Sequence, residues 1–260
     1  EMAAILAAAG TDILLPAYRQ RDKQSSGKSD GSVVTETDLR CQQHIRQQLE
    51  ARWPEIEFLG EEMTAEEQQT CLQGNDRYWC LDPLDGTTNF VTCFPGFALS
   101  LALIAHGSPQ LACIVDPVRD ETFSAELGQG AWLNAERLHA NPVDQLASAV
   151  GFVDFKRLNA RHRQIMSTPG HYRSQRNIGS CALEWAWLAA GRSQFIVHGG
   201  EKIWDFSAGG LIATEAGCML SDFAGLSLFN DIQPASSIIA GASEELHASL
   251  MNLLGNETYG

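Results

Sequence analysis

The sequence predicts a layered protein of mixed helix and sheet, class α+β, whose second half alternates strands with helices. Near the start of the chain, apolar residues recur at helical spacing, and short apolar runs bounded by turn residues follow them. After residue 142 such runs alternate with helical patterns, which is typical of sheets covered by helices. A length of 260 residues, of which 44% are hydrophobic, allows a large core.

The first segments predict two helices separated by a polar loop. Residues 1–20 carry apolar residues at helical spacing, and residues 20–32 are rich in Ser, Gly and Lys, which indicates a mobile loop. Lys28 lies in that loop and is expected to be solvated unless the loop approaches a phosphate. A second helix follows, with Thr37 as its expected N-cap and Asp38 as an acid in its first turn.

A run of strands comes next. Residues 56–60 and 78–81 are short apolar runs, and the second of them is expected to end at Asp82-Pro83, because proline cannot donate a hydrogen bond to a sheet. Residues 97–105 predict a core strand, and residues 110–127 a hairpin. The glycine-rich stretch 128–132 is predicted to be a turn, since no helical pattern follows it as in a nucleotide-binding loop.

The remaining segments alternate. The turn at Asn141-Pro142 marks the predicted boundary between an α+β domain, residues 1–142, and an α/β domain, residues 143–260. The expected strands or extended segments are 149–155, 172–178, 195–198, 219–223 and 238–240, and the expected helices are 158–167, 180–190, 205–216 and 244–254.

The stretch around Asp82 and Asp85 is the most informative part of the sequence. Two carboxylates bracket a tight turn, and Gly86-Thr87-Thr88 follows as the opening of a helix. Carboxylates bind Mg²⁺, and free N–H groups at a helix start bind phosphate, so one turn could bind both parts of a metal–phosphate complex. The alternative is that both aspartates are ordinary turn and capping residues, which are common at such places.

Other acidic residues are candidates for the same site. Glu61 and Glu62 directly follow a predicted strand, where they are credible metal ligands. Asp38 could act as a base that polarises a hydroxyl and, through it, a water. Asp205 stands where a helix is expected to begin, so on its own segment an N-cap role is favoured.

Composition limits the classes of function and location. The formal net charge of −14 argues against non-specific nucleic-acid binding, which needs basic surface. It also means that an anionic substrate would need bound cations nearby. The seven cysteines are scattered without a C-x-x-C pair, and neither a membrane-spanning run nor a signal peptide is visible. These features predict a cytoplasmic protein with reduced thiols that binds neither membrane nor nucleic acid directly.

The combined motifs resemble the inositol monophosphatase family of metal-dependent, lithium-sensitive phosphatases. The resemblance covers nearly the whole chain in the right order, and it implies the layered αβαβα sandwich of that family. The motifs that carry it are Val34-Thr35-Glu36-Thr37-Asp38, Gly60-Glu61-Glu62, Asp82-Pro83-Leu84-Asp85-Gly86-Thr87-Thr88, and Trp204-Asp205 followed by Ser207-Ala208-Gly209.

The resemblance also implies roles for individual residues, with two or three Mg²⁺ ions per site. The first ion would be bound by Glu61, Asp82 and the carbonyl oxygen of Leu84, and the second by Asp82, Asp85 and Asp205, with Glu62 supporting a weaker third ion. Gly86, Thr87 and Thr88 would contact the phosphate together with Asp85 and Asp205. Thr87 and Asp38 would orient the attacking water, with Glu61 also in the catalytic group, and Lys28 matches a lysine on the family's mobile loop.

The expected reaction is hydrolysis of a phosphate monoester by direct in-line attack of a metal-activated water. Metal ions neutralise the ester, lower the pKa of a bound water and stabilise the leaving oxygen, so no covalent enzyme intermediate is required. The expected substrate is a small polyol or sugar phosphate, with inositol monophosphate as the leading candidate. Histidinol phosphate, fructose bisphosphate and nucleotide 3′-phosphates are rivals within the enzyme class.

One position departs from the inositol-selective pattern. Those relatives carry a glutamate seven residues before the Trp-Asp aspartate, and here that position is His198. His198 is equally expected to be a substrate contact or an ordinary loop histidine. Gly179, Ser180 and Cys181 match a substrate-contact loop of the family. The family also implies a homodimer, and a regulatory protein that acts through a protein partner is the alternative from another functional class.

Overall fold

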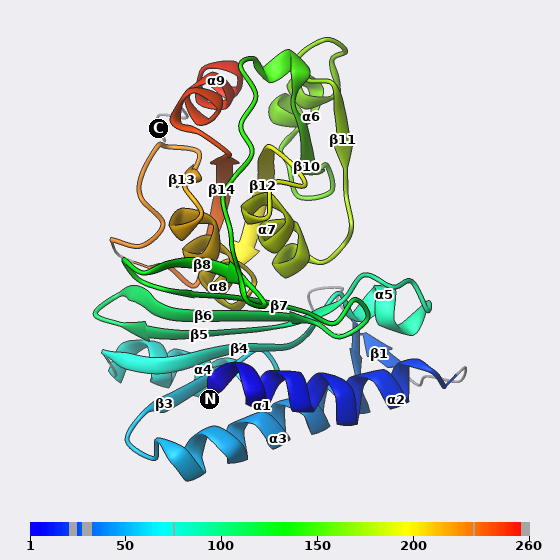
Figure 1. Cartoon of the computed structure of the whole chain (residues 1–260), viewed down its shortest axis with the longest axis vertical. Coiled ribbons are helices and arrows are strands. Elements are labelled where there is room, and N and C mark those ends of the chain that lie inside the picture. The colour runs from blue at the N-terminus through cyan, green and yellow to red at the C-terminus, as the bar shows by residue number, and fades with distance from the viewer. Residues whose placement is uncertain (21–24, 28–32, 75, 231, 256–260) are drawn as a thin grey trace.

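The chain folds into five layers in the order helix, sheet, helix, sheet, helix (Figure 1). The computed structural model describes residues 1–20, 25–27, 33–74, 76–230 and 232–255. The predicted αβαβα sandwich is therefore confirmed. Within the part of the chain described, no helix is both long and apolar enough to cross a membrane.

The first sheet has seven strands in the order β3-β4-β5-β6-β7-β8-β9. Strands β3 and β4 pair in parallel, and each later neighbour pairs antiparallel, as expected for strands joined by short turns. The strands are β3 (Glu57–Gly60), β4 (Arg77–Asp85), β5 (Ala98–Ala105), β6 (Ser108–Asp116), β7 (Glu121–Glu126), β8 (Gly130–Leu133) and β9 (Glu136–Arg137).

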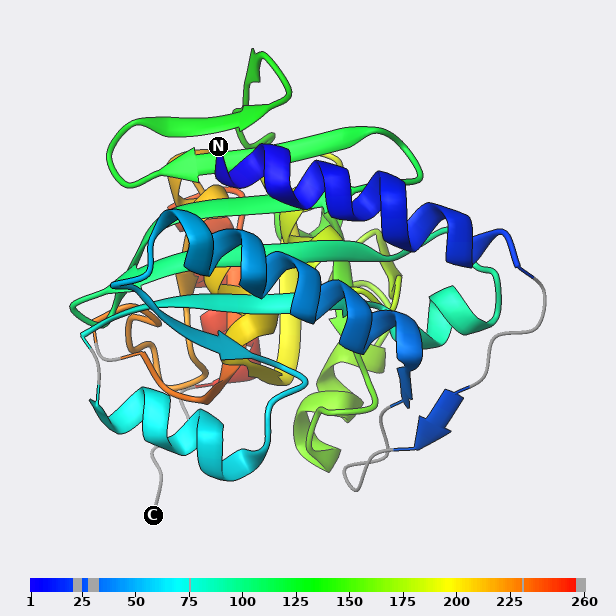
Figure 2. The ribbon, with the colours of Figure 1, turned by 90° about the horizontal axis from the view of Figure 1, so that it is seen from below.

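Two long helical segments cover the outer face of this sheet (Figure 2). The first is helical from Met2 to Tyr18, as predicted, but a π-helical turn interrupts it: α1 (Met2–Ala9), η1 (Gly10–Leu14) and α2 (Leu15–Tyr18). The second is α3 (Glu36–Arg52), which buries Cys41, Ile45 and Leu49 against the sheet. The apolar spacing seen in the sequence is thus explained by one buried stripe on each helix.

The second sheet has five strands in the order β11-β10-β12-β14-β13. Strand β10 lies parallel to both neighbours, whereas β14 runs antiparallel to β12 and β13. Helices α6 (Ala160–Ser167) and α9 (Glu244–Leu254) pack on its outer side (Figure 1). The strands are β10 (Val150–Asp154), β11 (Ser174–Arg176), β12 (Phe195–Lys202), β13 (Met219–Ser221) and β14 (Ala235–Gly241).

Two helices fill the space between the sheets and form the centre of the core. Helix α7 (Cys181–Ala189) and helix α8 (Ile203–Glu215) are buried on nearly every side, which is why their sequences are apolar almost all round. The start of α8 lies two residues earlier than the predicted start at Asp205. Both helices begin beside the carboxyl end of β4, so their first residues can reach the same cavity.

The prediction that the strand ends at Asp82-Pro83 is wrong, because β4 continues to Asp85. Its pairing with β5 is irregular between Asp82, which faces Ser100, and Asp85, which faces Ala98. Such a bulge takes Pro83 out of the ladder, where its missing N–H leaves no strand partner unsatisfied. The irregular segment also places both aspartates at one end of the sheet.

Two further local predictions need correction. Thr35, not Thr37, is the N-cap of α3: its hydroxyl oxygen accepts the Thr37 N–H at 3.2 Å, and the Thr35 N–H donates to Asp38 Oδ2 at 2.9 Å. Asp38 is in the first turn, as predicted. Part of the predicted loop forms strand β1 (Ser25–Gly27), which pairs with β2 (Val33–Thr35). Lys28 lies outside the described residues.

The glycine-rich stretch 128–132 is only partly a turn, since β8 begins at Gly130 and pairs with β7. Short helices complete the described chain: α4 (Ala65–Gly74), α5 (Thr87–Val91) and η2 (Leu146–Ser148). The first sheet ends at residue 137 and the second begins at residue 150, but α7 and α8 pack between them. The division into residues 1–142 and 143–260 stays a prediction.

Candidate active site

A cavity of about 480 Å³ lies where the end of β4 meets the first turns of α7 and α8. Its wall combines segments that are distant in the sequence, because the layered fold brings both sheets to one place. The residues that line it are Val33, Glu61, Asp82, Leu84, Asp85, Gly86, Thr87, Thr88, Asn89, Asp154, Lys156, Arg157, Asn177, Gly179, Ser180, Cys181, Glu184, His198, Gly200, Lys202, Trp204 and Asp205.

Three carboxylates meet in this cavity. Asp82, Asp85 and Asp205 each offer an oxygen, and these oxygens lie within 4.8 Å of one another. Backbone groups orient two of the carboxylates: the Leu84 N–H donates to Asp82 at 2.9 Å, and the Lys202 N–H donates to Asp205 at 2.8 Å. The sequence separation of Asp205 from the other two shows that the fold, rather than one local turn, assembles the cluster.

Burial and mutual repulsion raise the pKa values of the three aspartates. Burial, together with the charge of Glu61, raises the pKa of Asp82 well above its ordinary value. Burial and the neighbouring Asp85 raise the pKa of Asp205 to about 8, and burial raises that of Asp85 to about 6. Hard oxygen ligands that repel one another in a buried place fit a divalent cation such as Mg²⁺.

Asp85 is tied to helix α7. The Ser180 hydroxyl donates to Asp85 Oδ2 at 2.5 Å, and the Ala182 N–H donates to the same oxygen at 2.7 Å. Ser180 is also the N-cap of α7. The predicted substrate-contact loop, Gly179 to Cys181, therefore lies directly against the carboxylate cluster, although Ser180 follows Asp85 by 95 residues in the sequence.

Asp38 and Thr87 are brought together as the sequence predicted. The Thr87 hydroxyl donates to Asp38 Oδ1 at 2.9 Å and lies 3.0 Å from the carbonyl oxygen of Leu84. Asp38 Oδ2 accepts hydrogen bonds from the N–H and the hydroxyl of Thr35. Burial raises the pKa of Asp38. This fully buried carboxyl is held in place by α3 and aimed at the residue that begins α5.

The two glutamates after β3 differ in their position. Glu61 lines the cavity, and its charge contributes to the raised pKa of Asp38, Asp82, Asp85 and Asp205. The Glu62 N–H donates to the side-chain oxygen of Gln42 at 3.0 Å, which fixes the backbone behind the cavity wall.

His198 lines the cavity, but both of its ring nitrogens are engaged by the protein. Nε2 lies 3.1 Å from Asp154 Oδ2, and Nδ1 accepts the Gly200 N–H at 3.1 Å. Burial lowers the pKa of His198, so the ring is neutral near pH 7 and donates through Nε2. As placed here, the side chain holds Asp154 rather than offering a nitrogen to the cavity.

The sequence reasoning assigned no role to several residues of the cavity wall. Asp154, Lys156 and Arg157 come from the end of β10 and the turn after it, and Lys202 precedes α8. An aspartate at the end of an apolar strand was the available signal, since Asp82 has the same setting. Glu184 was also missed: it accepts the Ile178 N–H at 2.6 Å, and burial raises its pKa to about 8.

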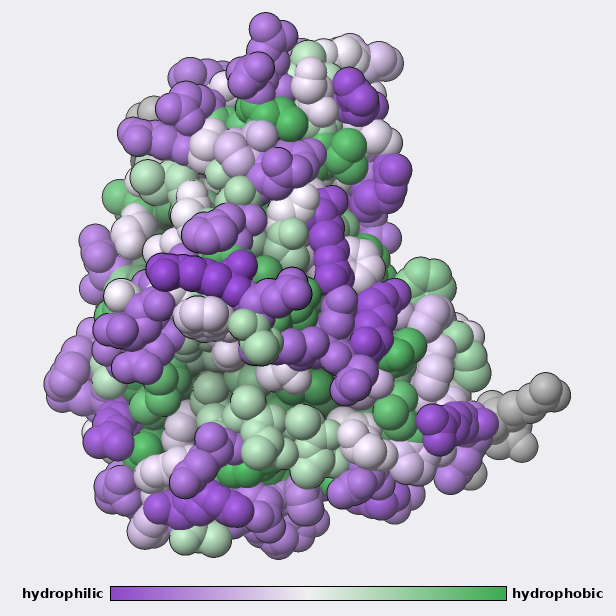
Figure 3. Space-filling view, viewed as in Figure 1, coloured by the Kyte–Doolittle hydropathy of each residue, from purple (hydrophilic) through white to green (hydrophobic). Residues whose placement is uncertain are grey.

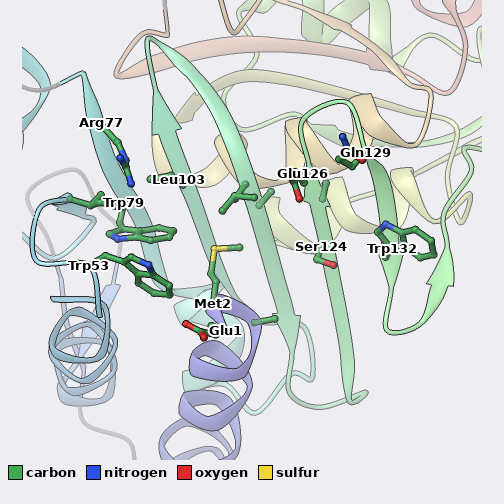
Figure 4. A pocket seen from close by; sticks show the side chains of 15 residues that line it. Glu1, Met2, Trp53, Arg77, Trp79, Leu103, Ser124, Glu126, Gln129 and Trp132 are labelled. Atoms are coloured by element: carbon green, nitrogen blue, oxygen red, sulfur yellow. The ribbon is translucent and has the colours of Figure 1, made fainter. Parts of the chain in front are cut away.

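A second cavity, of about 560 Å³, has a different character (Figure 4). It lies beside the start of α1, where Trp53 and Trp79 pack with their ring centroids 5.4 Å apart. Apolar residues also gather over α1 on the face shown in Figure 3. Among the described residues, no cluster of acidic side chains converges in the wall of this second cavity. The first cavity is therefore the candidate active site.

Comparisons with known proteins agree with this geometry. A family model described as the inositol monophosphatase family matches residues 1–259. The chain is 34% identical to the Nus factor SuhB of Vibrio cholerae over 240 residues, covering 90% of this chain and 86% of that protein. It is 34% identical to an inositol monophosphatase of Dictyostelium discoideum over 224 residues, covering 82% and 80%.

Solved structures give the same result. An inositol monophosphatase of Thermotoga maritima is similar in fold, with a TM-score of 0.82 at 29% sequence identity. The similarity covers 97% of each chain, so it includes both sheets, the helices between them and the segments that line the first cavity.

Proposed function

The chain belongs to the inositol monophosphatase family and is a phosphomonoesterase, and from this premise we propose that it hydrolyses a small polyol or sugar phosphate with Mg²⁺. Inositol monophosphate is the leading candidate, and histidinol phosphate, fructose bisphosphate and nucleotide 3′-phosphates are the alternatives. The observation that carries the proposal is the cluster of buried Asp82 and Asp85 with half-buried Asp205, beside the hydrogen-bonded pair of Asp38 and Thr87.

Two or three Mg²⁺ ions would be held at the acidic end of the cavity, which is the part lined by Glu61, Asp82, Asp85 and Asp205. Asp82, Asp85 and Asp205 would hold one ion, and Glu61, Asp82 and the carbonyl oxygen of Leu84 another, with Glu62 supporting a third. The raised pKa values of the three aspartates support this assignment, because a bound cation would remove the repulsion that raises them. When bound, Mg²⁺ supplies charge neutralisation, a more acidic water and stabilisation of the leaving oxygen.

The protein's own contribution to the reaction centres on Asp38 and Thr87. With its hydrogen donated to Asp38, the Thr87 hydroxyl can accept a hydrogen bond from a water and orient it. As the water oxygen bonds to phosphorus and the ester P–O bond breaks, a proton passes from the water to Thr87 and from Thr87 to Asp38. The departing alkoxide takes a proton from solvent, so no phosphorylated residue forms.

The phosphate and the alcohol are proposed to bind to different parts of the wall. Gly86, Thr87 and Thr88 border the carboxylates, so the transferred phosphate is placed there. Gly86 has φ 90°, and a Cβ at this position would lie 2.8 Å from the Gly96 carbonyl oxygen, so only glycine fits this turn. The loop from Gly179 to Cys181, with His198 behind it, is assigned to the alcohol.

Assembly, location and inhibition follow from the family resemblance. We propose a cytoplasmic homodimer that is inhibited by Li⁺. A sizing column with light scattering would measure the mass in solution, and a monomer at micromolar concentration would contradict the dimer. Phosphate release with increasing LiCl, against KCl as the ionic-strength control, would test inhibition by Li⁺.

The decisive test is phosphate release from a panel of esters, with and without Mg²⁺. The panel holds inositol monophosphate, histidinol phosphate, fructose 1,6-bisphosphate and a nucleotide 3′,5′-bisphosphate. We expect Mg²⁺-dependent release that is lost in Asp82→Asn and retained in Asp144→Asn, which changes an exposed loop carboxylate. Well-folded protein that releases no phosphate from any ester would contradict the proposal.

A regulatory role is the second candidate, because a relative with 34% identity is named Nus factor SuhB. Binding to a protein partner would not require turnover. A pull-down with the Asp82→Asn variant separates the two roles: a partner retained by this variant supports regulation, and no partner captured by either form argues against it.

A further inference from the structure

Three basic side chains line the same cavity as the carboxylate cluster. Lys156 and Arg157 follow strand β10, and Lys202 stands immediately before α8. They are exposed at the cavity wall, in a chain whose formal net charge is −14. Cations are repelled by bound Mg²⁺, so these side chains do not serve the metal. Their charge suits an anionic group on the ligand.

Arg157 is held in place by a buried carboxylate. Its Nη1 donates to Asp154 Oδ2 at 3.0 Å, and the Asp154 side chain is only 9% exposed, whereas that of Arg157 is 50% exposed. The Lys156 N–H donates to the other oxygen, Oδ1, at 2.8 Å. One edge of the guanidinium is therefore fixed, and its exposed part is presented to the cavity with further N–H donors.

His198 fixes Asp154 in turn. The Gly200 N–H donates to Nδ1 at 3.1 Å, so the ring hydrogen sits on Nε2 and points to Asp154 Oδ2. Cys181, His198 and Glu201 also have possible ligand atoms within 4.8 Å of one another. A metal site there is disfavoured, because both ring nitrogens of His198 already take part in hydrogen bonds. His198 thus acts as the support of an Arg–carboxylate pair.

The backbone around Arg157, Asp154 and His198 is also constrained. The pairing of β12 with β14 shifts register between His198 and Glu201, which marks a bulge at Gly199 and Gly200. The Arg157 carbonyl oxygen approaches so closely that a Cβ at Gly199 would lie 2.0 Å from it. The bulge of β12 therefore sets where the turn carrying Arg157 can lie.

We propose that Arg157 is a specificity-determining residue that binds a second phosphate on the alcohol half of the ester. Asp154 and His198 are its positioning residues. This inference rests on the proposed function, since it concerns the same cavity. A guanidinium fixed along one edge matches the oxygens of a phosphate through its remaining donors, whereas the hydroxyls of a neutral polyol need no such charge. Lys156 and Lys202 add positive charge beside it.

The test compares fructose 1,6-bisphosphate with fructose 1-phosphate, which differ only in the second phosphate. We expect the full chain with Mg²⁺ to prefer the bisphosphate in kcat/KM. Arg157→Gln should lower kcat/KM for the bisphosphate by about 10- to 100-fold, mostly through KM, as expected for loss of a charge-assisted hydrogen bond. Arg157→Gln should change kcat/KM for fructose 1-phosphate by less than about threefold. Arg161→Gln is the control, because Arg161 is exposed and lies outside the cavity wall. It should change kcat/KM by less than about threefold for both esters.

The positioning role is tested at His198. His198→Phe cannot donate to Asp154, so the preference for the bisphosphate should fall, whereas His198→Gln retains an N–H donor and should restore part of it. Equal losses on both esters in these variants and in Arg157→Gln would overturn the proposal, because they would indicate a structural role.

Binding measurements separate this inference from the proposed function. Calorimetry with the Asp38→Asn variant gives Kd values for both esters without rapid turnover. A bisphosphate that binds at least about tenfold more tightly than the monophosphate, with the difference lost when Arg157→Gln is added, supports the role of Arg157 even in a chain that releases no phosphate. Equal Kd values for the two esters would overturn it.

Discussion

The two ends of the cavity are built in different ways. At the acidic end, Asp82 and Asp85 come from one short irregular segment of β4, and backbone N–H groups orient their oxygens. At the basic end, Asp154 and His198 come from two strands of the second sheet and Arg157 from the turn after β10, and the three side chains hold one another. In the roles proposed above, the metal ligands are oriented largely by backbone N–H groups, whereas the preference for a substrate depends on side chains that hold one another.

The largest effect is expected from Asp205→Asn, which breaks the acidic end alone. Loss of one carboxylate from the cluster should lower kcat/KM by about 10³-fold for fructose 1,6-bisphosphate and fructose 1-phosphate alike, because the metal contributes several kcal/mol to the transition state of both. Steady-state phosphate release measures this. A change in the ratio of the two esters would show that the two ends are not independent.

A smaller loss is expected from the water-orienting pair. Thr87→Val removes the hydroxyl but keeps the shape, and it should lower kcat by about 10²-fold with little change in KM. Thr92→Val provides the control, since this exposed threonine at the end of α5 lies outside the cavity wall. If both variants lose equal activity, local distortion of α5 is responsible rather than the hydroxyl of Thr87.

Gly199→Ala tests the basic end without removing a charge. The added methyl group should displace the turn that carries Arg157, because it would meet the carbonyl oxygen of that residue. We expect about a tenfold loss of kcat/KM for the bisphosphate and little for fructose 1-phosphate. Gly74→Ala is the control, because a Cβ there meets nothing within 4 Å and Gly74 lies outside the cavity wall. Equal behaviour of the two variants would contradict the importance of this contact.

The smallest effect is expected on thermal stability, at Glu184 in helix α7, which lies between the acidic and the basic end of the cavity. Burial raises the pKa of Glu184 to about 8. The unfolded chain releases the proton of this carboxyl at about pH 4.3, whereas the folded protein keeps it up to about pH 8. The free energy of unfolding therefore falls as pH rises between these two values and stays at the lower level above about pH 8. Glu184→Gln should match the parent protein near pH 4 and exceed its Tm by about 4–8 °C at pH 9, for about 2 kcal/mol.

Thermal unfolding in EDTA measures this difference, and Glu66→Gln, an exposed glutamate on α4, provides the control. A Tm difference that stays constant between pH 5 and pH 9 would contradict the raised pKa of Glu184, because it would show that this carboxyl is ionised in the folded and the unfolded protein alike across the range.

Sequence could predict the acidic end because its residues lie in contiguous motifs. The motifs that contain Glu61, Asp82, Asp85 and Asp205 carried the resemblance to the inositol monophosphatase family, and this resemblance implied the five-layer fold and the ligand set. The spacing of apolar residues alone predicted only a layered protein of mixed helix and sheet. The extension of β4 past Pro83 was not predictable from strand propensity, since it depends on a bulge that only the pairing with β5 defines. The cap at Thr35 was displaced by two residues because both threonines suit the position.

The basic end was not predictable for a different reason. Asp154 lies within an apolar strand, and its partners follow either in the next turn or on another strand. Pairing of β10 with β12 places Asp154 opposite His198, which is a property of sheet register and not of local sequence. The sequence singled out His198 as unusual, but the reason for it, a hydrogen bond to Asp154, needed the fold.

The position of Asp205 and the Ser180–Asp85 hydrogen bond bear on how the protein is made. During synthesis the first sheet emerges from the ribosome long before helices α7 and α8 exist. Asp85 then lacks the Ser180 and Ala182 donors, and the cluster lacks its third carboxylate. In the proposed assignment of the metal ligands, Mg²⁺ therefore binds late, after most of the chain has left the ribosome, and the nascent protein has no complete phosphatase centre during translation.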